Sequence, residues 1–126
     1  MRKSILLILF FISLVTFGWS QNSAQDDNYK LAESVLNKAL TKQSSHTDTN
    51  IPSTPIKDES HAISVAEAAL FKVYGQKHIT DQKPYHIYNI NKYWVMFGTL
   101  HYSKGGTFYI VIDAKNSKVI EIYHEK

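Results

Sequence analysis

Residues 105–124 carry the pattern that most constrains the fold of this chain. Two runs rich in Val, Ile, Phe and Tyr flank a polar turn, Ala114-Lys115-Asn116-Ser117. β-Branched and aromatic side chains favour a pleated, half-buried surface, so the stretch predicts a β-hairpin. Within the turn we expect Asn116 to adopt a positive φ, because its side chain tolerates that conformation.

The hairpin has an aliphatic face and a mixed face, because side chains alternate across a strand. The side chains expected on the aliphatic face are Phe108, Ile110, Ile112, Ile120, Ile122 and His124. Those expected on the mixed face are Thr107, Tyr109, Val111, Asp113, Val119, Glu121 and Tyr123. The aliphatic face requires another element to cover it.

An amphipathic helix predicted over residues 58–74 provides that cover. Asp58 and Glu59 would lie at its start, where negative charge complements the helix dipole, and Gly75 is a suitable C-cap. The apolar stripe consists of Ala62, Ala66, Ala69, Leu70 and Val73. Small residues allow close approach to a sheet, so we expect helix-on-sheet packing.

Two further strands are predicted between this helix and the hairpin. Residues 76–83 form a polar connector anchored by Ile79, and strands follow at 85–90 and 93–100 with Asn91-Lys92 as a tight turn. Gly98 suggests a bulge or bend. The predicted fold class is therefore α+β, with one helix packed on a four-stranded antiparallel meander over residues 56–126.

The second face of this sheet is rich in tyrosine. Its members are Tyr109, Tyr123, Tyr93 and either Tyr85 or Tyr88. A domain this small gains little support from a bare sheet face. We expect the N-terminal helix, a second copy of the chain or a partner to cover it.

The N-terminal region is predicted to comprise an export signal, a helix and a linker. Residues 1–20 combine Arg2 and Lys3 with an apolar run at 5–17 and small residues at 18–20, as in a cleaved signal peptide. An uncleaved anchor is the alternative, but the run is shorter than the ~20 residues of a spanning helix. Within 21–55 we expect a separate amphipathic helix at about 26–43, capped by Asp26 or Asp27, and then a flexible linker.

Composition narrows the functional classes. The chain has no cysteine, which excludes disulfides, thiolate metal sites and a lipoprotein anchor. Without Arg2 and Lys3, the 14 basic residues fall to 12 against 11 acidic ones, and the lysines are scattered. This balance gives no indication of nucleic-acid binding.

The residue patterns predict no catalytic, cofactor or metal site. The six histidines include no pair at i, i+4 helical spacing and no carboxylate–histidine motif, so we expect solvated or edge side chains. No Ser lies in a nucleophile elbow. Glu67 and Asp113 are the candidate acids, and Asp113 is expected to cap its turn.

With the elements in this order, the chain resembles the bacterial immunity proteins of the nuclear-transport-factor-2 fold, the group that includes the YbbC/YhhH-type proteins. The segments that carry the resemblance are residues 56–75, Gln82-Lys83-Pro84-Tyr85, Tyr93-Trp94, Gly98-Thr99-Leu100 and 105–110. It implies a cystatin-like α+β domain. It also implies a non-enzymatic antidote to a cognate secreted toxin, of the kind delivered by polymorphic toxin or type VI secretion systems.

Together with export, the resemblance implies a periplasmic protein that occludes a toxin, with no stable membrane insertion after signal cleavage. Candidate partner-binding residues, chosen for their chemistry and expected exposure, are Tyr85, Tyr88, Tyr93, His101, Tyr102, Lys104 and Tyr123. One alternative is an exported PepSY-type module that restrains a protease or associates with the envelope. Another is an enzyme with a cone-shaped pocket. Homodimerisation is left open.

Overall fold

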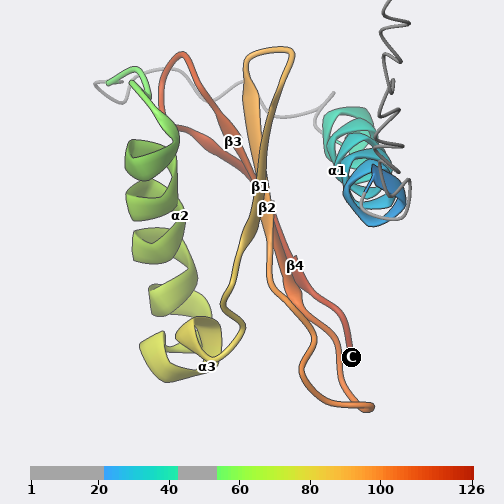
Figure 1. The fold of residues 1–126 in the computed structure, drawn as a ribbon. Coiled ribbons are helices and arrows are strands. Elements are labelled where there is room, and N and C mark those ends of the chain that lie inside the picture. Colours follow the sequence, from blue (N-terminus) through green and yellow to red (C-terminus); the bar gives the residue numbers. More distant parts are fainter. Residues whose placement is uncertain (1–21, 43–53) are drawn as a thin grey trace, which may run out of the picture.

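The computed structural model describes residues 22–42 and 54–126. The helices are α1 (Asn22–Lys42), α2 (Glu59–Tyr74) and α3 (Gln76–Thr80), and the strands are β1 (His86–Ile90), β2 (Tyr93–Phe97), β3 (Phe108–Asp113) and β4 (Val119–His124). The strands form one antiparallel sheet in the order β1-β2-β3-β4, with α2 and α1 on opposite sides (Figure 1). The predicted fold class, a helix packed on a four-stranded meander, is confirmed.

Helix α2 begins and ends at the residues that the sequence indicates. The carboxylate of Asp58 accepts a hydrogen bond from the backbone N–H of His61 at 2.8 Å, and Gly75 ends the helix with φ 88°. Ala62, Ala66 and Leu70 are buried, as the apolar stripe predicts. Val73 was wrongly included in this apolar stripe, because its side chain is 58% exposed.

The layer between α2 and the sheet is one of two apolar cores. Its buried members are Ala66, Leu70, Ile79, Met96, Phe108, Ile110 and Ile112. Ile79 belongs to α3, so the predicted polar connector contains a short helix whose expected anchor is fully buried.

The β3–β4 pairing contains a bulge that alternation alone misses. Val111 pairs with Glu121 while Ile112 pairs with Val119, which leaves Ile120 as an extra residue in β4. Val119 therefore packs with the α2 layer and Ile120 with the α1 layer, the reverse of the predicted faces.

The turn residues of the two hairpins follow the expected chemistry, with one correction. Asn91 and Lys92 both have positive φ, 50° and 66°, as a tight two-residue hairpin requires. In the second hairpin the positive φ falls on Ser117, at 57°, rather than on Asn116. The Asn116 side chain instead accepts a hydrogen bond from the backbone N–H of Lys118 at 2.9 Å.

Helix α1 covers the tyrosine-bearing face of the sheet (Figure 1). Its buried residues Ala32, Val35, Leu36 and Ala39 pack with a set from the strands: Ile90, Val95, Phe97, Tyr109 and Val111. The alternatives left open by the sequence are thus resolved in favour of the N-terminal helix. Asp26 does not cap it, because α1 already includes Asn22, and Asp26 instead contacts Lys30 Nζ at 3.3 Å.

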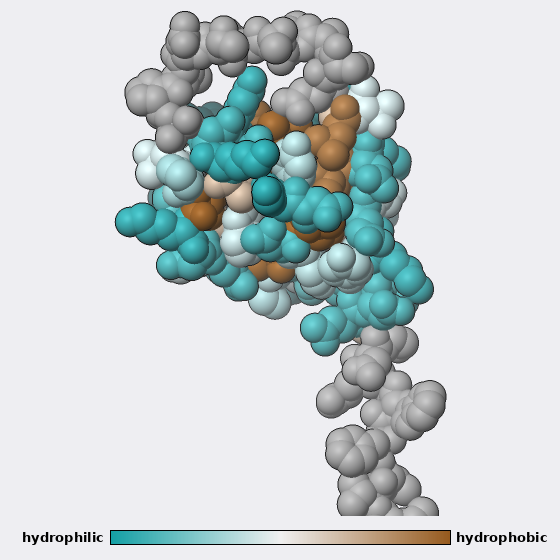
Figure 2. Space-filling model, turned by 90° about the horizontal axis from the view of Figure 1, so that it is seen from above, coloured by the Kyte–Doolittle hydropathy of each residue, from teal (hydrophilic) through white to brown (hydrophobic). Residues whose placement is uncertain are grey.

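The end of the molecule that carries the β1–β2 and β3–β4 turns has a mixed surface. Its hydrophobic residues form separate patches framed by hydrophilic ones (Figure 2).

No helix within the described residues combines the length and the apolarity needed to cross a membrane. The predicted signal peptide and most of the predicted linker lie outside those residues.

Candidate functional site

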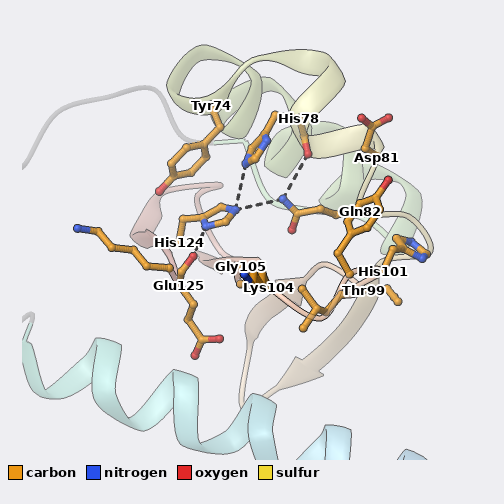
Figure 3. A pocket seen from close by; sticks show the side chains of 14 residues that line it. Tyr74, His78, Asp81, Gln82, Thr99, His101, Lys104, Gly105, His124 and Glu125 are labelled. Carbon is orange, nitrogen blue, oxygen red and sulfur yellow. Dashed lines mark hydrogen bonds between the residues drawn. The ribbon is translucent and has the colours of Figure 1, made fainter.

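A hollow of about 710 Å³ lies at the end of the sheet that carries α3, the β2–β3 loop and the last residues of the chain (Figure 3). Residues from these three segments, far apart in the sequence, line it together. They are Tyr74, His78, Asp81, Gln82, Thr99, Leu100, His101, Tyr102, Lys104, Gly105, Gly106, His124, Glu125 and Lys126.

Gln82 organises the floor of this hollow. Its side chain is buried, and its Oε1 accepts a hydrogen bond from the backbone N–H of Phe108 at 2.9 Å. That bond fixes the orientation of the amide, so the NH₂ group donates to the His78 carbonyl at 3.3 Å and lies 3.2 Å from His124 Nε2. Gly98 makes room for it, because a Cβ there would lie 2.4 Å from Gln82 Oε1. Gly98 is therefore a point of close approach, one residue after β2 ends.

Two histidines meet above Gln82. His78 comes from α3 and His124 from the end of β4, and their Nε2 atoms are 3.1 Å apart (Figure 3). The ring centres lie 5.0 Å apart, and Tyr74 packs beside the pair with its ring centre 5.4 Å from that of His124.

Hydrogen bonding assigns a tautomer to His124. Its Nδ1 contacts the backbone carbonyl oxygen of Glu125, which only accepts, so Nδ1 carries the proton. Its Nε2 is then an acceptor with one lone pair, which the Gln82 NH₂ group and His78 Nε2 both face at 3.2 and 3.1 Å. On this basis we assign the proton of His78 to its Nε2.

The β2–β3 loop forms the rim of the hollow and projects apolar side chains. Leu100 is 51% exposed and Tyr102 is 78% exposed. The base of the loop is tied down, since the Thr99 N–H donates to the Gln82 carbonyl at 2.8 Å and His101 Nε2 lies 2.6 Å from the Lys83 carbonyl oxygen. Gly105 has φ 92°, a positive value that glycine adopts without steric cost. The tip therefore presents two exposed apolar residues on an anchored base.

The structure separates the seven candidate partner-binding residues into two groups. His101, Tyr102 and Lys104 line the hollow, and all three are exposed. The other four are half-buried tyrosines, so their expected exposure was wrong: Tyr85, Tyr88, Tyr93 and Tyr123. A role in partner binding stays a prediction for all seven.

The half-buried tyrosines are packed within the fold. Tyr88, Tyr93 and Tyr123 pack against the α1 layer. Tyr85 packs against the α2 layer, where its hydroxyl donates to Glu67 Oε2 at 3.0 Å. Burial, together with this bond, raises the pKa of Tyr85.

The candidate acids have structural partners. Glu67 accepts a hydrogen bond from the Tyr85 hydroxyl. Asp113 Oδ1 accepts one from the backbone N–H of Lys115 at 2.8 Å, which confirms the expected turn cap.

Among the residues that the structure describes, no group of three or more His, Asp or Glu side chains could hold a metal ion.

Sequence reasoning missed the central part of this site. His78 and His124 are 46 residues apart, so no spacing rule connects them. Gly98 gave the one local signal, because a glycine within a strand pattern can mark a close approach, here by Gln82.

Comparison with known proteins places this chain in a family. The sequence model of a family described as "NTF2 fold immunity protein" matches residues 61–126, more than half of the chain. The chain belongs to this family. Membership indicates toxin neutralisation in general terms, and the expected family resemblance is confirmed.

Two relatives of this immunity protein from Escherichia coli strain K12 are similar over most of their length. One is described as uncharacterized protein YhhH, which is 26% identical over 117 residues, covering 91% of this chain and 85% of the relative. The other is described as uncharacterized protein YbbC, which is 35% identical over 83 residues, covering 64% of this chain and 68% of the relative. No solved structure matches the chain.

The family match covers every segment that forms the hollow. It begins within α2 and includes α3, all four strands and the β2–β3 loop, while α1 lies outside it. In this immunity protein the hollow therefore belongs to the family domain, and the helix that covers the second sheet face comes from the preceding segment.

Proposed function

We propose that this immunity protein neutralises a cognate antibacterial toxin by binding and occluding it, without catalysis of its own. The observation that carries the proposal is the exposed pair Leu100 and Tyr102, 51% and 78% exposed, beside a hollow of about 710 Å³. Both faces of the sheet are already covered by α1 and α2. The end of the sheet that carries the β2–β3 loop then offers apolar contact area to another protein, next to a hollow.

The chemistry of this end suits protein recognition. A few aromatic and aliphatic anchors supply most of the affinity in a typical interface. Tyr102 provides a large contact area at low entropy cost, and the hollow beside it can receive a protruding side chain from the toxin. Lys104 and Lys126 line the hollow together with Glu125, while Asp81 is paired with Lys77 at 2.6 Å. The two lysines would speed encounter with an acidic surface.

Export completes the proposal. Residues 1–20 have the charge and hydropathy pattern of a cleaved signal peptide. We therefore place the mature protein in the periplasm and its toxin among those that act there, on the envelope.

The test combines capture with growth rescue. Residues 21–126 serve as bait in an envelope extract of the producing cells, and each captured protein, or the product of an adjacent gene, is expressed in the periplasm of a sensitive strain. The full chain with residues 1–20 should restore growth, and a version without them should not. Failure of the exported chain to rescue growth from any of these proteins would count against the antidote role. A captured protease that the chain inhibits would instead support the PepSY-type alternative.

A further inference from the structure

We propose that His78 and His124 form a chelating site for a divalent ion from the zinc–copper end of the first transition series. The two residues provide two imidazole ligands. The remaining coordination positions, open to the hollow, are completed by water or by a side chain of a bound partner.

The distance between the two nitrogens fits a shared ion. Zinc–imidazole bonds are about 2.0–2.1 Å long, so two such bonds to nitrogens held 3.1 Å apart enclose an angle of about 100°. That angle lies between those of square-planar and tetrahedral coordination, the geometries that Cu²⁺ and Zn²⁺ prefer. The ring centres lie 5.0 Å apart and the ring planes are inclined by 33°, so the two imidazoles already lie next to each other.

His124 is already in the tautomer that binds a metal. A ligating histidine usually donates its other ring N–H to a carbonyl or carboxylate, which fixes the ring and raises its basicity. The contact between His124 Nδ1 and the Glu125 carbonyl provides this support, and it leaves Nε2 unprotonated. Glu125 is itself held by a backbone bond from its N–H to the Thr107 carbonyl at 3.1 Å.

His78 requires only a proton shift. In the ion-free state its Nε2–H donates to His124 Nε2, so binding moves that proton to Nδ1 with no net loss from the pair. His78 is exposed, and solvent can carry the proton. The Gln82 amide then loses His124 as an acceptor and keeps the His78 carbonyl. The cost is the two hydrogen bonds that His124 Nε2 accepts, one from His78 and one from Gln82, and this is small beside two metal–nitrogen bonds.

A site with two protein ligands leaves open positions on the ion. Since the hollow is also the surface we propose for toxin docking, a carboxylate or imidazole of the toxin is the group chemically suited to fill one. This last step rests on the proposed function, whereas chelation by the histidine pair does not.

The experiment uses the mature chain without an affinity tag, because a histidine tag would bind the same ions. Thermal melting and calorimetric titration are carried out with Zn²⁺, with Cu²⁺ and with Mg²⁺ as a hard-ion control. We expect Zn²⁺ to raise the melting temperature, Cu²⁺ to bind more tightly than Zn²⁺, and Mg²⁺ to have no effect. Binding should weaken as the pH falls, because protons compete with the ion for the two ligand nitrogens.

Two variants and one matched control locate the site. His78→Gln and His124→Gln should each weaken Zn²⁺ binding at least about tenfold, since loss of a mere supporting contact already costs that much. His101→Gln lies in the same hollow and should bind Zn²⁺ like the wild type. The His78→Gln variant is decisive, because His78 is exposed and its replacement should leave the fold intact. Circular dichroism of this variant in EDTA checks that it is folded. No Zn²⁺ binding by the wild type, or equal binding by His78→Gln, would overturn the proposal.

Discussion

The side-chain oxygen of Gln82 lies 2.9 Å from the backbone nitrogen of Phe108 and accepts its hydrogen bond. This bond joins the segment after α3 to the first residue of β3, and it turns the amide NH₂ toward His124. Because the N–H of Phe108 has this side chain as its partner, the floor of the hollow and the end of the sheet depend on one glutamine.

Replacing Gln82 with Ala should lower the free energy of unfolding by about 1–3 kcal/mol, because the substitution leaves the buried N–H of Phe108 without a partner. Urea denaturation measures the change. Gln25→Ala, at an exposed position of α1, is the matched control and should stay within about 0.5 kcal/mol of the wild type. Equal losses in both variants would mean that the Gln82–Phe108 bond contributes nothing specific.

Leu36→Ala should destabilise the chain by about 2–5 kcal/mol, because Leu36 is 2% exposed in the layer between α1 and the sheet. Glu33→Ala, on the exposed side of the same helix, should change stability by less than about 0.5 kcal/mol. The measurement is again urea denaturation of the mature chain. If Leu36→Ala matched Glu33→Ala, α1 would not be a stable cover of the tyrosine face.

Much of this fold could be predicted because local chemistry determined it. Asp58 and Gly75 cap the two ends of α2 and so determine where the helix begins and ends. Asn91 and Lys92 adopt positive φ and so form the tight turn between β1 and β2. The β4 bulge could not be predicted, because Val119 and Ile120 are both aliphatic and either could face α2. Packing of the whole sheet decides which of the two residues faces α2. A strict alternation of faces along the strand cannot indicate where a bulge occurs.

The candidate site was less predictable than the fold. Tyr102 was correctly expected to be exposed, since it lies in a polar loop beside glycines. Tyr88 and Tyr123 were wrongly expected to be exposed, because a tyrosine on a strand looks the same in sequence whether a helix covers it or not. The His78–His124 contact arises only when α3 and the end of β4 meet in space.

Stability should fall as the pH rises above about 10. Burial raises the pKa of Tyr123 to about 12 and also raises that of Tyr109, so both stay protonated in the folded chain where unfolded tyrosines, with a pKa of about 10, ionise. The unfolded state then binds fewer protons, and stability is lost progressively between pH 10 and 12.

Tyr123→Phe provides the comparison for this alkaline loss. The variant lacks one of the ionisable groups and should lose stability less steeply between pH 10 and 11 than the wild type. Urea denaturation at several pH values gives both slopes. Identical slopes would show that Tyr123 does not contribute to the alkaline loss.

Tyr85→Phe separates structural from binding tyrosines. The variant loses the hydrogen bond to Glu67, so we expect a loss of stability of about 1 kcal/mol and unchanged protection against the toxin. Thermal melting and the growth assay measure the two effects. Loss of protection in a variant of unchanged stability would restore Tyr85 as a contact residue.

The most direct test of docking at the end of the sheet is growth protection by a double variant, Leu100→Ala with Tyr102→Ala. Both side chains are exposed, so the variant should fold and melt like the wild type, and loss of a two-residue anchor should weaken toxin binding by about 30-fold or more. Val73→Ala, at an exposed apolar position outside the hollow, is the control. We predict that cells expressing the toxin grow with the wild type and with Val73→Ala but not with the double variant. Full protection by the double variant would contradict the account.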